Sequence, residues 1–170
     1  YLKQLSNKGV KIFLLTFDKR KLLDDRTLVE KTKKLLKGSG IEWRVLRYHK
    51  NPSLLATLYD IISGFLIGFW LIKRNSIDII HARSYVASLI ALFLKKVTGC
   101  KFIFDMRGFW PEERVEGGIW KKDCQLYGIA KFFEKEFILN SDWIIVLSQR
   151  AKEVMEKHYL GGIKRNIEVI

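Results

Sequence analysis

The chain has 170 residues, a hydrophobic fraction of 48% and an aromatic fraction of 13%, which suffice for a folded domain with a core and exclude a disordered chain. Its formal net charge of +13 favours an anionic partner, namely nucleic acid, lipid headgroups or a phosphorylated substrate, or else a solvated basic surface. Cys100 and Cys124 have no CxxC spacing and no nearby histidine pair. We therefore expect a reducing compartment and neither a disulfide framework nor a bound metal.

Short apolar runs alternate along the chain with longer segments of helical spacing. The first residues resemble the last turns of a helix closed by Gly9, so the chain is expected to begin in mid-fold. Strands followed by helices predict parallel βαβ units in an open, mostly parallel, Rossmann-like α/β sheet with helices on both faces. Strands are expected at 10–16, 41–48, 77–81, 101–105, 142–147 and, unfinished, 166–170. Helices are expected at 24–37, 53–74, 85–98, around 126–137 and after residue 148.

The segment Ser53–Ile72 is nearly long and apolar enough to span a bilayer. Asp60 interrupts it, and the uninterrupted part, Ile61–Ile72, would be only about 18 Å long as a helix. Two interpretations stay open, a helix buried against the sheet and a neighbouring helix, or one that also touches a lipid interface or a lipid acceptor. The small or polar residues of this segment form one narrow stripe, Thr57, Asp60, Gly64 and Gly68.

Ionisable residues follow two strands that we expect to be neighbours. The segment 77–84 reads IDIIHARS, and the segment 101–108 reads KFIFDMRG. Ligands of open α/β sheets bind at the carboxyl ends of the strands, so these two ends predict the floor of an active-site cleft. The candidate catalytic residues are His81, Asp105 and Arg107. The candidate substrate-binding residues are Arg83, Ser84, Gly108, Glu112, Glu113 and Ser148.

Each of the charged candidates from these strand ends has a structural alternative. His81 can act as a general base or bind hydroxyls, or it can be tied to the neighbouring backbone. Arg83 and Arg107 can form a pair that binds phosphate, or one of them can neutralise Asp105.

The later candidates also allow two interpretations. Glu112 and Glu113 follow Pro111 in a long connection, where they can accept hydrogens from sugar hydroxyls or act as a base, or can form the first turn of a short helix. Ser84 and Ser148 are both placed to cap a helix, and Ser148 can also mark a phosphate site. The sequence contains no GxGxxG, GxxxxGK[ST], HExxH or GxSxG motif, which disfavours dinucleotide-binding, NTPase, metalloprotease and hydrolase functions.

Nearly the whole chain resembles the amino-terminal domain of family-four glycosyltransferases, retaining enzymes of the GT-B fold. The resemblance rests on the order of LSNKGVKIFLLT, IDIIHARS, KFIFDMRGFWPEE, SDWIIVLSQRAKEVM and NIEVI. It implies two Rossmann-like domains facing across a cleft, with the acceptor on the amino domain and the nucleotide-sugar on the carboxyl domain. It also implies no cofactor or metal, and retention by front-face attack assisted by the donor phosphate. Many members act at membranes on lipid-linked or polysaccharide acceptors, which implies a cytoplasmic protein peripheral to the inner membrane face.

The chain departs from the family pattern in two ways. Many members carry a histidine after the strand where this chain has DMRG, and here Arg107 stands near that place. The first strand with its glycine-rich loop and the donor domain with its paired glutamates are not among these residues. We therefore expect residues 1–170 to be the acceptor-side half of the enzyme, inert alone and completed by its own carboxyl-terminal domain.

The alternative is a basic α/β module without catalysis that binds nucleic acid or a partner protein. The segment Lys19–Lys37 is rich in lysine and arginine, as such a module requires. It contains no aromatic residue on which a base could stack, so nucleic acid is a less favoured partner than a sugar acceptor or an anionic membrane.

Overall fold

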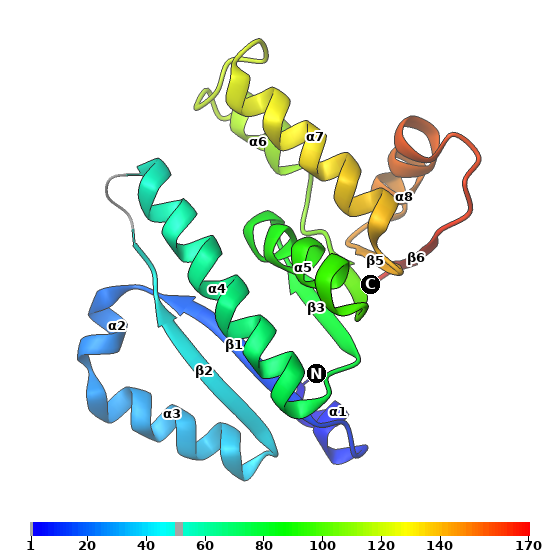
Figure 1. Cartoon of the computed structure of the whole chain (residues 1–170). Coiled ribbons are helices and arrows are strands. Elements are labelled where there is room, and N and C mark those ends of the chain that lie inside the picture. Colours follow the sequence, from blue (N-terminus) through cyan, green and yellow to red (C-terminus); the bar gives the residue numbers. More distant parts are fainter. Residues whose placement is uncertain (1, 50–52) are drawn as a thin grey trace. The chain divides into compact units, whose positions relative to one another are not determined.

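The structure is a computed structural model that describes residues 2–49 and 53–170, without the side chains of residues 21, 22, 53 and 54. Backbone contacts divide the chain into two compact units. Unit 1 ends at Leu71, and unit 2 comprises Ile72–Ile170. Each unit has its own sheet, and all the strand pairs described in both sheets are parallel (Figure 1).

Unit 1 is built on a two-stranded sheet. Its strands pair in register from Ile12 opposite Ile41 to Asp18 opposite Arg47, and α3 packs against β2. The Asp25 carboxylate begins α3 by accepting a hydrogen bond of 2.9 Å from the Leu28 N–H. The elements of unit 1 are α1 (Leu2–Asn7), β1 (Ile12–Asp18), α2 (Arg20–Asp24), α3 (Arg26–Gly38), β2 (Ile41–Arg47) and most of α4 (Ser53–Asn75).

Unit 2 has a four-stranded sheet in which neighbouring strands follow chain order, β3-β4-β5-β6. At least one helix connects each strand to the next, as parallel pairing requires. Its elements are β3 (Ile79–Arg83), α5 (Tyr85–Thr98), β4 (Lys101–Asp105), α6 (Trp110–Glu116), α7 (Gln125–Asn140), β5 (Trp143–Val146), α8 (Gln149–Met155), the π-helix η1 (Glu156–Leu160) and β6 (Asn166–Val169).

The predicted α/β class with parallel strands flanked by helices is confirmed. One boundary that bears on the site was wrong, since β3 runs from Ile79 to Arg83 rather than from Ile77 to His81. The Ile77 N–H bonds the Ile72 carbonyl, and Ser76 has a φ of 50°, so this stretch still closes α4. His81 is consequently the middle residue of its strand and not its end.

The core of unit 2 lies between its sheet and the helices α5, α7 and α8. Phe102 and Phe104 of β4 are completely buried, and so are Ile144 and Val146 of β5. Phe137 of α7 packs on Phe104 with ring centroids 5.4 Å apart. Full burial of such side chains contributes roughly 1.5–3 kcal/mol each, which fixes β4 and β5 side by side.

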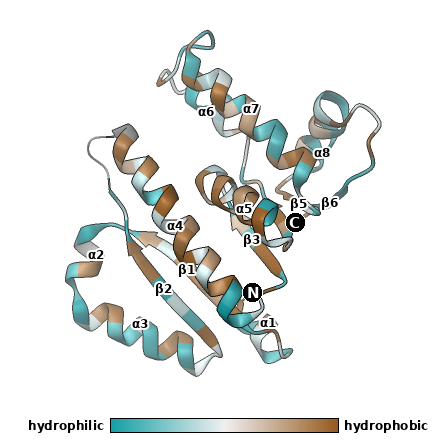
Figure 2. Cartoon of the chain, in the orientation of Figure 1, coloured by the Kyte–Doolittle hydropathy of each residue, from teal (hydrophilic) through white to brown (hydrophobic). Residues whose placement is uncertain are grey.

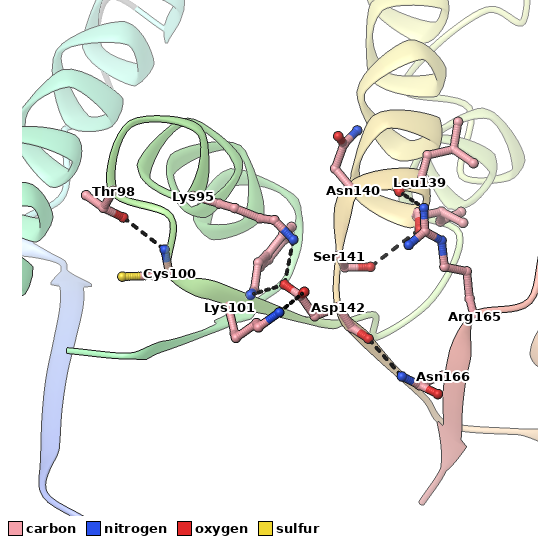
Figure 3. A network of polar contacts seen from close by, with 12 residues as sticks. Lys95, Thr98, Cys100, Lys101, Leu139, Asn140, Ser141, Asp142, Arg165 and Asn166 are labelled. Carbon is pink, nitrogen blue, oxygen red and sulfur yellow. Dashed lines mark hydrogen bonds and ion pairs between the residues drawn. The ribbon is translucent and has the colours of Figure 1, made fainter.

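A polar cluster joins the amino ends of β4 and β5 (Figure 3). The Asp142 carboxylate accepts hydrogen bonds from Lys95 of α5 at 2.5 Å, from the Phe102 N–H at 2.8 Å and from Lys101 at 3.2 Å. Burial raises the pKa of Asp142, but these donors outweigh it and hold the pKa at about 2, against an ordinary value of 3.8. This edge of the sheet is therefore structural.

The lowered pKa of Asp142 predicts an acid-sensitive contribution to stability. The contribution is complete above pH 4 and is lost as the pH falls toward 2, because the unfolded chain takes up the proton first. Asp142→Asn should lower the free energy of unfolding by about 2 kcal/mol at pH 7, measured by urea denaturation. Asp24→Asn, which breaks an exposed ion pair with Arg20, is the control and should cost less than about 0.5 kcal/mol. Equal losses for both variants would contradict the assignment.

Helix α4 is apolar over most of its length, whereas α3 is mainly hydrophilic (Figure 2). Among the described residues, Leu55–Asn75 has the length and mean hydropathy, 1.8, that a membrane span requires, with 33% of its most apolar window buried. This longer stretch includes Asp60 and qualifies by length and composition only, which the uninterrupted part Ile61–Ile72 does not. The described part of the helix buries one narrow face and exposes its bulky apolar face, which contradicts burial on two sides, while contact with a lipid interface stays a prediction.

Candidate functional site

A pocket of about 830 Å³ opens on unit 2 where β4 and β5 end. One wall follows β4 and continues into α6, and the other wall follows β5 and continues into α8 and η1. This is the edge of a parallel sheet at which ligands bind. The lining residues are Met106, Arg107, Gly108, Phe109, Glu112, Glu113, Glu116, Lys122, Leu147, Ser148, Arg150, Ala151, Val154, His158 and Tyr159.

The fold brings five of the sequence-predicted site residues together in this pocket. They are Arg107, Gly108, Glu112, Glu113 and Ser148. Of the described residues, the other four candidates, His81, Arg83, Ser84 and Asp105, are not among those that line it. The candidate site is thus formed after β4 and β5 rather than after β3 and β4.

His81, Arg83 and Asp105 form a separate cluster across β3 and β4. The His81 Nε2 atom lies 3.2 Å from Asp105 Oδ2, and the Arg83 Nε atom lies 3.9 Å from the same oxygen. The position of Arg83 therefore matches its structural alternative, in which it neutralises Asp105. Asp105 is 7% exposed, and its Oδ1 atom is buried without a hydrogen-bond partner within the described residues.

Glu112 and Glu113 lie in the first turn of α6, directly after Pro111. Glu112 Oε1 accepts hydrogen bonds from Lys131 at 2.7 Å and from the Tyr127 hydroxyl at 3.2 Å. Its Oε2 atom is shielded from solvent and has no protein partner in the part of the chain that the structure describes. Lys131 therefore fixes Glu112 by one oxygen, and the other oxygen is enclosed without a protein partner among the described residues.

Glu113 packs directly over Gly108. A Cβ atom at Gly108 would come within 2.1 Å of Glu113 Oε1, so any larger residue would displace this carboxylate. The buried Tyr85 hydroxyl lies 3.3 Å from the Gly108 carbonyl and holds the same backbone from below. Glycine at this position therefore permits a carboxylate to lie close to the floor of the pocket.

The pocket wall rests on a carboxylate that is completely buried, that of Glu134 in α7. It accepts hydrogen bonds from the hydroxyls of Tyr85 and Tyr159 and from the Lys131 ammonium. Burial raises the pKa of both tyrosines, and the neighbouring Glu134 raises it further, so both stay protonated donors. Burial lowers the pKa of Lys131, but its carboxylate partners outweigh this and raise it, which keeps the lysine charged.

An aromatic surface completes this wall. Phe109 and Tyr159 stack with ring centroids 6.4 Å apart and an interplanar angle of 19°, and the Lys131 ammonium lies 5.0 Å from the Tyr159 ring. The pocket therefore combines an aromatic face, carboxylates and several cationic side chains.

A family model for Glycosyltransferase Family 4 matches residues 1–170, the whole chain. The chain belongs to glycosyltransferase family 4. The resemblance drawn from the sequence motifs is thereby confirmed, and the protein has a glycosyltransferase role with a sugar donor and an acceptor as its general substrates. A comparison with curated proteins found no match.

Two serines of this family 4 chain occupy helix starts in different ways. Ser148 accepts a hydrogen bond of 3.1 Å from the Ala151 N–H, so it is the N-cap of α8. Ser84 precedes α5, but its side chain makes no capping hydrogen bond and its φ is 74°. The prediction that Ser84 caps α5 through its side chain was wrong, because its positive φ departs from the extended backbone that a capping serine adopts.

Several pocket residues of the family 4 domain were missed from the sequence. Arg150, His158 and Tyr159 follow β5, in a region where we predicted only a helix and its stop at Gly161. The π-helix η1 turns Tyr159 toward Glu134, and such turns are frequent at functional sites. No periodicity in the sequence distinguishes a π-helix from the last turn of an α-helix. Among the described residues, no group of three His, Cys, Asp or Glu side chains is arranged to hold a metal.

The dependence of the pocket wall on Lys131 can be tested by Lys131→Met. The variant leaves the buried Glu134 carboxylate without its cation, which should cost about 3 kcal/mol of stability in urea denaturation. Lys135→Met on the exposed side of the same helix is the matched control and should cost under about 0.5 kcal/mol. A Lys131→Met variant as stable as the control would show that Glu134 does not need the charge.

Proposed function

We propose that this chain is the acceptor-side domain of a retaining glycosyltransferase. The enzyme moves a hexose from a nucleotide-sugar to a glycan or lipid-linked acceptor in the cytoplasm, and a separate carboxyl-terminal domain binds the donor. Membership in family 4 supports the sugar transfer, and the pocket after β4 and β5 supports the acceptor role. The proposed chain alone transfers no sugar.

The observation that carries this proposal is that carboxylates and an aromatic face line the same pocket. Sugars present hydroxyls around their ring and C–H groups on their faces. The pocket-lining carboxylates of Glu112 and Glu113 would accept hydrogen bonds from the hydroxyls. Phe109 and Tyr159 would pack against the ring, as apolar surface does in most small-molecule pockets.

Cations at the pocket would serve the phosphate groups of the reaction. Arg107 and Lys122 line one wall, and Arg150 lines the other. Guanidinium groups bind phosphate through paired hydrogen bonds, so Arg107 and Arg150 are the proposed partners of the donor phosphates or of an acceptor phosphate. Retention would follow from attack on the donor face that carries the leaving phosphate, which itself takes the acceptor proton.

His81 and Asp105 have a positioning role in this proposal. Asp105 immediately precedes the pocket segment, and its bond to His81 ties β4 to β3. The pair would hold the start of that segment and would not touch the substrate. Arg107 therefore remains the candidate from this strand end for contact with reacting groups.

The pocket also weighs against the nucleic-acid alternative. Glu112, Glu113 and Glu116 all line it, and carboxylates repel the phosphate backbone that dominates nucleic-acid affinity.

The proposal is tested by saturation-transfer NMR of the 170-residue chain with a panel of methyl hexosides and hexose 1-phosphates. At least one probe should bind, and Glu112→Gln should weaken it by about 10–100-fold, since a hydrogen bond to a charged group contributes about 1.5–3 kcal/mol. Glu30→Gln on α3, far along the chain from the pocket, is the control and should bind as the native chain does.

Two results would contradict the proposal. One is equal affinity of the Glu112→Gln and Glu30→Gln variants for every probe that binds. The other is transfer of labelled hexose from a nucleotide-sugar by the 170-residue chain alone, which would show that no separate donor domain is needed.

A further inference from the structure

A histidine lies just beyond the carboxyl end of the sheet in unit 1. Strand β2 ends at Arg47, and the Tyr48 N–H then donates a hydrogen bond of 2.8 Å to the carbonyl of Asp18, the last residue of β1. His49 is the next residue. Ligands of parallel α/β sheets bind at this edge, so a side chain at this place can face a ligand. None of the site residues predicted from the sequence lies in unit 1.

A buried carboxylate of α4 fixes the ring of this histidine. Asp60 is 4% exposed, and its Oδ2 atom accepts a hydrogen bond of 2.9 Å from the His49 backbone N–H. Its Oδ1 atom lies 2.6 Å from His49 Nδ1. A carboxylate only accepts hydrogen bonds, so Nδ1 carries the hydrogen of this contact and Nε2 is left for other partners. Both oxygens of Asp60 are therefore used on one residue.

The second ring nitrogen of His49 has no protein partner in the part of the chain that the structure describes. The His49 side chain is 33% exposed, and its hydrogen bond to Asp60 is made through Nδ1. The Tyr59 ring, in a residue that is 60% exposed, stands edge-on beside the imidazole, with ring centroids 5.1 Å apart and an interplanar angle of 89°. An exposed aromatic ring thus stands next to a polar atom whose direction is fixed.

Joining β2 to α4 does not by itself require this pair. The His49 backbone N–H already binds one oxygen of Asp60, and apolar packing between the two elements would avoid the cost of burying a carboxylate. The second oxygen of Asp60 orients the ring. Carboxylates fix the orientation of histidines in the same way at catalytic and metal-binding sites. The arrangement therefore indicates that Nε2 has a ligand.

The geometry also narrows the chemistry of that ligand. A metal ion would need further protein ligands, and among the described residues no group of three His, Cys, Asp or Glu side chains could hold one. An anion would need the protonated ring, whose positive charge the Asp60 carboxylate already offsets. A hydroxyl suits either form of the ring, since it can donate to the neutral Nε2 atom and accept from the protonated one.

We propose that His49 and Tyr59 form a second sugar-binding site, on unit 1, in which His49 Nε2 bonds a sugar hydroxyl and the Tyr59 ring packs against the sugar. Sugars carry both hydroxyls and an apolar C–H face, and the chain belongs to a family of sugar transferases. Asp60 is a positioning residue that does not touch the ligand. With one ring and one polar atom, this site should bind a monosaccharide more weakly than the pocket of unit 2. It shares no residue with that pocket.

The test is long-range ¹H–¹⁵N NMR of the imidazole nitrogens in the 170-residue chain, titrated with methyl hexosides. The Nε2 signal of His49 should move with at least one hexoside. His49→Asn removes Nε2 but keeps an amide donor near the place of Nδ1, so Asp60 stays satisfied. This variant should bind the hexoside about 3–10-fold more weakly, the loss expected for one hydrogen bond, as followed by the amide signals of residues 48, 59 and 60.

A matched pair of variants tests the aromatic part of the site. Tyr59→Ala removes the ring and should weaken binding, whereas Tyr59→Phe keeps the ring and should bind as the native chain does. Glu112→Gln, which alters only the pocket of unit 2, should leave the response of His49 unchanged. A failure of the second site can therefore be told apart from a failure of the proposed acceptor pocket.

Three results would overturn the second site. The first is an Nε2 signal that no hexoside moves, including the case in which inorganic phosphate moves it instead. The second is a His49→Asn variant that is as stable as the native chain in urea denaturation and binds the hexoside equally well. The third is equal binding by Tyr59→Ala and Tyr59→Phe, which decides the matter if His49→Asn lowers the stability.

Discussion

The pocket of unit 2 depends on one buried charge, the carboxylate of Glu134. It lies fully inside the unit and accepts hydrogen bonds from the start of α5, from η1 and from its own helix. Burial of a carboxylate costs free energy unless hydrogen-bond donors surround it. The native fold must therefore place a donor from each of these elements beside Glu134. Through Lys131 the same network reaches Glu112, and through Tyr159 it reaches the aromatic wall. The ligand-facing groups are thus positioned from behind by residues that face no ligand.

The amino ends and the carboxyl ends of the strands in the four-stranded sheet have different roles. At the amino ends, Asp142 engages both of its carboxylate oxygens with Lys95, Lys101 and the Phe102 N–H and joins elements of the fold. At the carboxyl ends, Glu112 keeps one oxygen without a protein partner among the described residues. Parallel strands place all their carboxyl ends at one edge, so a domain of this class can stabilise one edge and reserve the other for ligands.

The sequence predicted the fold class well because periodicity reports burial directly. The strand at 101–105 was predicted exactly as it occurs, and the capping of α8 by Ser148 followed from its position before an apolar-periodic segment. The positions of the candidate site residues were harder to predict from the sequence. The strand β3 lies two residues later than predicted, so His81 is at its centre and not at its end. The apolar pattern of the run IDII does not show at which residue the strand begins. The network around Glu134 joins residues up to 49 positions apart, and no local pattern reveals such a contact.

The central claim is that the carboxyl ends of β4 and β5 form the acceptor site. Amide chemical-shift mapping of the 170-residue chain, titrated with the hexoside that binds most tightly, tests it most directly. The account predicts that the largest shifts fall in two stretches, residues 106–116 and 147–159, which form the two walls of the pocket. Shifts confined to unit 1, or to the edge around Asp142, would contradict it.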